Sequence, residues 1–300
     1  KLPRSSRRPL MRKIVTLDIG GTNIKVGIFE DEVLVQEAEI PTLAKQGAKD
    51  VIDRCITFIK QYMPCDGIGI STCGQVNNND GSIHYANENM PGYTGMQVKK
   101  IFEEEFNVKV TVENDVYAAA RGENQYGAGK GYKDFICLTY GTGIGGGVYL
   151  NGQPYYGAGK SAGVMLGGMI LQTSTVNKQW DGSYESLAST TALIQNAQKV
   201  NPCITNGRVL FEHLNEPEIK AVLDAWIEQI AIGLCSLTHV YNVPLFILGG
   251  GILEQEYVFN NIKKAYQKYV IPGFNGVQIH QAKLGNKAGI YGALALNISR

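Results

Sequence analysis

Apolar residues gather in short runs along this chain, and the runs alternate with stretches in which apolar positions recur every three to four residues. Lys13–Asp18 is almost continuously apolar and stops at an acid, which is typical of a buried strand whose end reaches a ligand site. Helical spacing occupies Ala48–Ile59, 185–200, 218–239 and 257–269. Such alternation of strands and helices predicts a layered α/β fold.

A glycine-rich turn follows the first of these strands. Residues 18–22 read Asp-Ile-Gly-Gly-Thr, and residues 23–29 then alternate polar and apolar, so the unit is expected to be a hairpin. It is neither a Walker A loop nor a Rossmann fingerprint. Glycine lets backbone N–H groups approach phosphoryl oxygens, and a neighbouring carboxylate suits a Mg²⁺ ion bound to those phosphates. The alternative is a structural hairpin with Asp18 at the surface.

A second turn of the same kind strengthens the phosphate interpretation. An apolar strand at 135–139 leads into Tyr-Gly-Thr-Gly-Ile-Gly-Gly-Gly at 140–147, and the strand after it ends in the reverse turn Asn151-Gly152. The repeat indicates two half-domains that share one phosphate chain. The strand at 245–251 ends in three glycines, and Gly-Asn-Lys-Ala-Gly at 285–289 opens the last apolar segment. Both are candidates to line a nucleotide, or else are ordinary turns.

Asp115 is the candidate general base. The β-rich run Val108–Val112 is followed by Glu113-Asn114-Asp115, and a helical stretch begins at Val116. A carboxylate at such a junction is held rigidly where it can accept a hydroxyl proton. The alternative is that Asp115 only caps the helix, because Asp is a favoured N-cap residue. Together with the two phosphate turns, the pattern favours catalysis.

The order of these motifs resembles the ROK family of the hexokinase, actin and Hsp70 superfamily. The resemblance covers Lys13–Leu296 and is most specific at 18–25, 113–115, 141–147 and 249–251. It implies an α/β protein with a two-domain actin-like ATPase (ribonuclease H-like) fold and an interdomain cleft. It also implies an ATP-dependent carbohydrate kinase that phosphorylates a sugar hydroxyl, the 6-OH of a hexose, N-acetylhexosamine or β-glucoside. The alternative is a non-catalytic or weakly active sugar-binding regulator of the same family.

The resemblance also assigns roles to single residues. Asp115 is expected to be the base, and Asp18 is expected to lie near Mg²⁺ and to contact it through water. The residues expected to contact the sugar are Gly74, Asn89, Asn114, Asp115 and Glu185. Those expected to contact ATP are Gly20, Gly21, Thr22, Lys25, Thr142, Gly143, Gly145, Gly146, Gly250, Gly251 and Asn286. ATP and Mg²⁺ are therefore the implied cofactors.

One part of the family pattern, a zinc site, is missing from this sequence. The family builds that site from a histidine and a short cluster of cysteines. Here no cysteine lies between Cys137 and Cys203, and none of the four histidines lies between His84 and His213. We therefore expect no zinc.

The residues that align with the zinc site leave the identity of the sugar open. Ser183 stands at the last zinc cysteine, while Glu185, the acid that contacts the sugar, is retained. Val164 or Met165 stands where the family has a glutamate, and Gly168 stands at its histidine. Losing an acid and an imidazole removes hydrogen-bond partners and opens space on the anomeric side of the sugar. The pattern is similar to the zinc-less, β-glucoside kinase-like branch of the family.

Chain length favours two domains. We expect the 300 residues to form an N-terminal α/β domain at 11–117 and a C-terminal α/β domain at 118–300. The last helix is a candidate to pack back on the N-terminal domain. Residues 1–10 are interpreted as a tag or a disordered lead. Ten residues cannot encode the helix-turn-helix domain of the family's repressor branch, so a DNA-binding repressor is not expected.

Charge and cysteine content narrow the expected partners and compartment. The 28 basic and 27 acidic residues give no basic field for nucleic acid. No apolar run approaches the about 18 residues of a membrane span. Six scattered cysteines without a signal sequence fit a reducing, cytoplasmic location. The family resemblance implies a homodimer.

Overall fold

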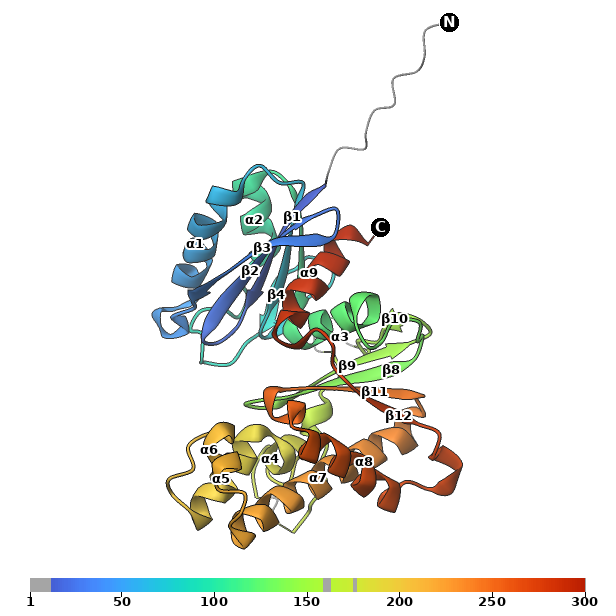
Figure 1. Ribbon diagram of the computed structural model, residues 1–300. Helices are drawn as coiled ribbons and strands as arrows, with labels where there is room; N and C mark the ends of the chain where they lie inside the picture. Colours follow the sequence, from blue (N-terminus) through green and yellow to red (C-terminus); the bar gives the residue numbers. More distant parts are fainter. Residues whose placement is uncertain (1–11, 159–162, 175–176, 300) are drawn as a thin grey trace, which may run out of the picture. The chain divides into compact units, whose positions relative to one another are not determined.

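The fold is described from a computed structural model, which covers residues 12–158, 163–174 and 177–299. The expected lead at residues 1–10 lies outside these ranges. The chain divides into two compact units, and each has its own sheet and helices (Figure 1).

The two units are not simply the first and second parts of the chain. Of the described residues, the first unit contains 12–122, Ala158 and 287–299, and the second contains 123–157, 163–174 and 177–286. The division therefore falls inside a helix, α3 (Asp115–Tyr126), whereas the sequence suggested a boundary between 117 and 118. Helix α9, the last helix, belongs to the first unit.

The first unit is built on a five-stranded sheet in the order β3-β2-β1-β4-β7. Strands β1 and β2 form the expected antiparallel hairpin, while β1, β4 and β7 run parallel. The strands and helices of this unit are β1 (Lys13–Ile19), β2 (Asn23–Glu30), β3 (Val33–Pro41), η1 (Ala44–Gln46), α1 (Ala48–Ile59), η2 (Lys60–Tyr62), β4 (Gly67–Thr72), β5 (Gln75–Val76), β6 (Ile83–Tyr85), α2 (Val98–Phe106), β7 (Lys109–Asn114), α3 and α9 (Ala288–Ile298). Parallel strands end at one edge of a sheet, and β1, β4 and β7 therefore present their last residues together.

The two faces of this sheet carry side chains of different size. Ile68 and Ile70 of β4 join the apolar core with α1 and α2, whereas α9 packs on the other face (Figure 1). That second face is lined by glycine because α9 lies very close: a Cβ on Gly69 would come within 2.3 Å of the carbonyl oxygen of Ala293. Asn297 also donates a hydrogen bond from Nδ2 to the carbonyl oxygen of Ile68, at 3.0 Å.

The second unit repeats the architecture of the first. Its sheet has the order β10-β9-β8-β11-β12, in which β8 is antiparallel to β9 and parallel to β11, and β11 is parallel to β12. Residues 141–150 show the same succession of exposed, half-buried and buried positions as residues 21–30. The strands are β8 (Phe135–Tyr140), β9 (Ile144–Leu150), β10 (Gln153–Pro154), β11 (Leu245–Gly249) and β12 (Gln278–Gln281). The repeated turn in the sequence thus belongs to a repeated sheet.

The helices predicted for the second unit are present, one of them in two pieces, and α6 (Gly207–Glu212) was not predicted. The helix expected over 185–200 is two helices, because Ser189 ends α4 and its hydroxyl accepts the Ala192 N–H at 3.2 Å to cap α5. The helices are η3 (Leu166–Gly168), α4 (Tyr184–Ala188), α5 (Thr190–Val200), α6 (Gly207–Glu212), α7 (Pro217–Tyr241), η4 (Gly251–Glu254), α8 (Glu256–Tyr269), η5 (Pro272–Phe274) and η6 (Gly285–Lys287).

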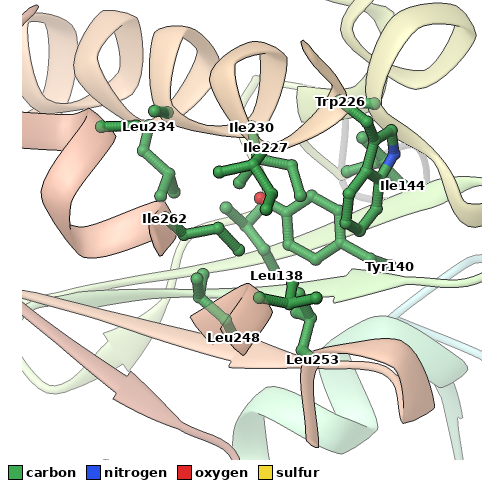
Figure 2. Packing of buried hydrophobic residues seen from close by; sticks show 14 of the residues in the cluster. Leu138, Tyr140, Ile144, Trp226, Ile227, Ile230, Leu234, Leu248, Leu253 and Ile262 are labelled. Carbon is green, nitrogen blue, oxygen red and sulfur yellow. The ribbon is translucent and has the colours of Figure 1, made fainter. Parts of the chain in front are cut away.

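Helix α7 supplies much of the core of the second unit. Trp226, Ile227 and Ile230 point from α7 toward Leu138 and Tyr140 of the sheet (Figure 2). In the part of the chain that the structure describes, α7 is the one helix long and apolar enough to cross a membrane, judged by length and composition alone. More than half of that apolar stretch is buried inside the structure, which is also the property of a core helix.

Candidate active site

Asp18 lies at the sheet edge where the parallel strands of the first unit end. It is aligned with Ser71 on β4 and with Lys25 on β2, and the Ser71 hydroxyl donates a hydrogen bond to Asp18 Oδ1 at 2.7 Å. Burial raises the pKa of Asp18 above its usual value, while the Ser71 hydrogen bond and the Lys25 charge act in the opposite direction. The first turn of α9 abuts this carboxylate, since a Cβ on Gly289 would lie 2.5 Å from each carboxylate oxygen.

Asp115 is fixed where β7 ends and α3 begins. Its Oδ1 accepts hydrogen bonds from Asn114 Nδ2 at 2.8 Å and from the Val116 N–H at 2.9 Å. Burial, and after it the charge of Asp18, raises the pKa of Asp115 to about 6. A carboxylate with this pKa is ionised at neutral pH and is a stronger base than an ordinary aspartate, which suits it to accept a proton.

Asn114, next to Asp115, caps helix α3. Its Oδ1 accepts the N–H groups of Val116 at 3.0 Å and Tyr117 at 3.3 Å. Its Nδ2 donates to Asp115 and, at 2.9 Å, to the carbonyl oxygen of Gly74. The capping role considered for Asp115 is therefore taken largely by Asn114. Because Asn114 is engaged on both sides of its amide, the structure also gives it a positioning role, and its contact with a sugar stays a prediction.

The expected sugar-binding turns are anchored by buried residues. Gly74 has a φ of 90°, and a Cβ there would lie 3.0 Å from the carbonyl oxygen of Tyr85, so both backbone and packing require glycine. In the turn after Asn89, the buried Tyr93 hydroxyl is 2.6 Å from Thr72 Oγ1. Asn89 itself is exposed and available to a ligand.

Hydrogen bonds between residues of the first unit hold the first glycine turn. Gly20 N–H donates to Asn23 O at 3.1 Å, and the buried Thr42 holds the turn by donating from Oγ1 to Gly20 O at 2.7 Å and from its N–H to Thr22 O at 2.8 Å. A Cβ on Gly21 would meet no atom within 4 Å. Gly21 has no internal packing reason to be glycine, and the space beside it can admit a phosphate.

In the second glycine turn the glycines have different neighbours. A Cβ on Gly143 would lie 2.3 Å from Glu185 Oε2, and one on Gly146 would lie 2.5 Å from Leu166 Cδ1. These two glycines are thus required by internal packing, whatever they do for a phosphate. Gly141 is exposed, and a Cβ there would meet nothing within 4 Å. Sequence reasoning did not separate Gly141 from its neighbours as the open position.

Glu185, the retained acid of the sugar prediction, supports this turn. Its Oε2 accepts the N–H of Ile144 at 2.9 Å, immediately after Gly143. Of the other predicted residues of the turn, Thr142 is exposed, and Gly145 is paired across the strands with Thr139.

The residues predicted to contact the nucleotide in the last two glycine-rich segments, Gly250, Gly251 and Asn286, lie in the second unit. Gly250 has a φ of 131°, and a Cβ there would be 2.2 Å from the carbonyl oxygen of Tyr140; the end of β11 thus passes directly over the end of β8. A Cβ on Gly251 would meet nothing within 4 Å. Asn286 is exposed in η6. Sequence reasoning missed Glu123, which is 1% exposed. Its carboxylate accepts the Leu284 N–H at 2.8 Å and so holds the loop that leads into η6.

The residues aligned with the family's zinc site have other neighbours here. Ser183 accepts the Ser186 N–H at 3.1 Å as the N-cap of α4. A Cβ on Gly168, at the position of the zinc histidine, would lie 3.4 Å from the ring of Trp180. Among the described residues, no three His, Cys, Asp or Glu side chains are grouped so that they could hold a metal ion. The absence of zinc stays a prediction.

The predicted residues thus divide between the two units. The first unit brings Asp18, Lys25, Asn114 and Asp115 to one sheet edge beside a glycine turn, and the second carries the other glycine turn with Glu185. A duplicated sheet of this order, with a glycine turn after the first strand of each copy, defines a protein of the actin-like ATPase fold. The predicted fold class is confirmed.

The chain belongs to the ROK family, whose model matches residues 14–300. It is 28% identical over 310 residues to a glucokinase of Thermotoga maritima, covering 95% of this chain and 96% of the relative. It is also 28% identical over 296 residues to a β-glucoside kinase of Listeria monocytogenes, with coverages of 94% and 96%. A solved ROK family glucokinase from Streptomyces griseus, in complex with glucose and AMPPNP, superposes with a TM-score of 0.80 at 26% identity, covering 95% of this chain and 99% of the other.

Proposed function

We propose that this chain is an ATP- and Mg²⁺-dependent carbohydrate kinase that transfers the γ-phosphoryl group of ATP to a sugar hydroxyl. The acceptor is the 6-OH of a hexose, an N-acetylhexosamine or a β-glucoside. The observation that carries the proposal is the Asp115 carboxylate, which has a pKa of about 6 and is fixed at a strand-to-helix junction. Asp18 and an open glycine turn lie in the same unit.

Asp115 takes the proton of the sugar hydroxyl as that oxygen attacks the γ-phosphorus and the bond to the β-phosphate oxygen breaks. Asn114 holds the carboxylate in orientation through the 2.8 Å hydrogen bond from Nδ2 to Asp115 Oδ1. Because phosphoryl transfer depends mainly on positioning and charge stabilisation, no nucleophilic side chain of the protein is needed.

The open glycines fit the phosphates of ATP. The space that a Cβ would occupy is unfilled at Gly21, Gly141 and Gly251. Backbone N–H groups need such open space to reach phosphoryl oxygens. Asp18 and Ser71 provide oxygen atoms of the kind that Mg²⁺ prefers. When bound, Mg²⁺ neutralises the charge of the phosphates. Asp18 supplies a single carboxylate, which agrees with contact through water.

The sugar contacts are proposed for Gly74, Asn89, Asn114, Asp115 and Glu185. The relatives named as glucokinase and β-glucoside kinase support glucose and its β-glucosides as the first acceptors to test. Ser183 and Gly168 stand where the family has a zinc cysteine and the zinc histidine, and neither side chain is an ordinary zinc ligand. This supports activity without zinc.

We also propose that the enzyme is cytoplasmic and forms a homodimer. Support for the compartment is that all six cysteines are free thiols, as in a reducing environment. Family membership supports the dimer. Sedimentation of the purified chain tests the dimer, and a monomer at micromolar concentration would contradict it.

A coupled assay with ATP and Mg²⁺ over hexoses, N-acetylhexosamines and β-glucosides tests the kinase proposal. We expect turnover on at least one acceptor, and we expect Asp115→Asn to reduce it by about 10²–10⁴-fold. Asp80→Asn is the matched control, since Asp80 lies on an exposed loop of the same unit. A chain that binds a sugar by calorimetry but phosphorylates none would be the sugar-binding regulator instead.

A further inference from the structure

Large apolar side chains are exposed near Glu185 in the second unit. Met165, Ile170 and Trp180 are 55%, 48% and 43% exposed. Met165 directly precedes η3, while Ile170 and Trp180 lie between η3 and α4. Ile170 pairs with Ser183 in an isolated β-bridge, which places the two sides of this segment next to each other. Apolar side chains that gather on a surface mark a binding site more often than single exposed ones do.

The backbone around Trp180 is held in place. The Asp181 carboxylate accepts the N–H groups of Asn177 and Lys178, each at 3.1 Å, and Trp180 O accepts the Ser183 N–H at 3.1 Å. Trp180 has a φ of 72°, a left-handed conformation that bulky residues rarely adopt. An exposed indole kept in such a conformation agrees with a binding role.

The Trp180 ring and Glu185 each lie on the open side of one of two adjacent glycines. A Cβ on Gly168 would lie 3.4 Å from Cζ3 of Trp180 and 3.9 Å from Cβ of Met165, while a Cβ on Gly167 would lie 3.4 Å from Cβ of Glu185. We call Met165, Gly168 and Trp180 the Trp180 platform. The Trp180 ring thus lies beside Gly168, and the preceding residue, Gly167, lies beside Glu185, the proposed sugar ligand.

We propose that the Trp180 platform binds a second ring joined to the acceptor sugar, so that the preferred substrates of this protein are glycosides. The proposal rests on the proposed function, because it takes Glu185 as a ligand of the phosphorylated sugar. An indole face stacks well against a flat apolar surface, and the thioether of Met165 adapts to such a surface. The C–H face of a second pyranose and an aryl group both provide one.

Tryptophan fluorescence tests the platform without turnover. The chain has two tryptophans, and Trp226 is 3% exposed, so quenching by acrylamide reports mainly on Trp180. The probes are glucose, cellobiose and phenyl β-glucoside, without nucleotide. We expect cellobiose or phenyl β-glucoside to protect Trp180 from the quencher and glucose not to. Protection by cellobiose identifies a second pyranose as the occupant, and protection by phenyl β-glucoside identifies an aryl group.

Three results would overturn the proposal. One is an absence of protection by both glycosides, and another is equal protection by glucose. The third is protection that follows protein concentration and not ligand, because Trp180 would then lie at an interface between copies of the chain. Trp180→Phe serves as the signal control, since it should remove the accessible emission and leave that of Trp226.

Kinetics give an independent readout. Trp180→Ala should raise KM for the bound glycoside by about tenfold and leave KM for glucose unchanged, while Trp180→Phe should restore most of the loss. Tyr269→Ala is the matched control, because Tyr269 is also 43% exposed but lies on α8. An equal rise for glucose and glycoside would refute the platform. No turnover by the unaltered chain on any sugar would count against the kinase, while the quenching experiment would still decide the platform.

Discussion

Replacing Asp115 with asparagine should make the protein more stable while it removes activity. The pKa of Asp115 rises from 3.8 to about 6, through burial first and the charge of Asp18 second. A rise of about two units corresponds to about 3 kcal/mol by which folding disfavours the ionised carboxylate. The side chain keeps partial contact with solvent, so we expect a gain of about 1–3 kcal/mol in the free energy of unfolding.

The gain should depend on pH in a defined direction. Because the pKa of Asp115 is higher in the folded than in the unfolded chain, the unaltered protein loses stability as pH rises from about 4 to about 6. Asparagine has no charge to bury, and its Oδ1 can still accept the hydrogen bonds of Asn114 and Val116. The difference between variant and unaltered protein should therefore be close to zero near pH 4 and largest above pH 7. Turnover by the unaltered protein should fall below pH 6, as the base becomes protonated.

Thermal unfolding of both proteins between pH 4 and pH 8 measures this difference. Nucleotide and metal are left out because a cation near Asp18 would change the local charge. Asp80→Asn is the control of opposite sign: hydrogen bonds from Ser82 lower the pKa of Asp80, so removal of its charge should reduce stability at neutral pH. A variant at position 115 that is less stable at pH 8, or a stability difference that is independent of pH, would refute the reasoning.

Three further predictions concern glycine packing and metal. Gly289→Ala should lower turnover at least tenfold, because its methyl group would press on the Asp18 carboxylate; normal kcat would contradict the proposed contact. Gly146→Ala should lower the free energy of unfolding by about 1–3 kcal/mol, because its methyl group would overpack against Leu166. Gly141→Ala should leave the melting temperature unchanged and raise KM for ATP. The same change in melting temperature and in KM for both variants would contradict this difference in packing. A zinc-selective chelator should leave the melting temperature unchanged and elemental analysis should find no stoichiometric zinc, whereas removal of Mg²⁺ should abolish turnover and preserve the fold.

Local patterns were sufficient for much of the fold. The apolar run at 13–18 and the alternation at 23–29 predicted the β1–β2 hairpin, and helix α1 begins and ends where the three-to-four spacing placed it, at Ala48 and Ile59. The helix over 185–200 was predicted without its interruption. That break depends on Ser189, whose carbonyl oxygen accepts the Nε1–H of Trp226 at 2.9 Å, and such a distant partner leaves no periodic signal.

The same reason explains what sequence reasoning missed in the candidate site. Thr42 follows an ordinary strand, and nothing near it in the sequence indicates that it holds the first glycine turn. Glu123 is one acid in a helical stretch, yet its carboxylate reaches a loop 161 residues later. Gly289 was read only as part of the last turn, although it abuts Asp18. Motif spacing identifies residue types that suit a reaction, but the supporting contacts are made across the fold.

Glu185 shows why loss of activity cannot by itself assign a sugar ligand in this protein. Its carboxylate accepts the Ile144 N–H at 2.9 Å and packs against Gly143, so Glu185→Ala would also release the second glycine turn. A ligand role predicts a rise in KM for the sugar with KM for ATP unchanged, whereas a support role predicts a rise in KM for ATP. Since Oε2 is engaged with the turn, Oε1 is the oxygen left for a hydroxyl. Glu185→Gln, which keeps one acceptor oxygen, should therefore disturb ATP binding less than Glu185→Ala does, and equal KM values for ATP in the two variants would show that the turn does not depend on this hydrogen bond.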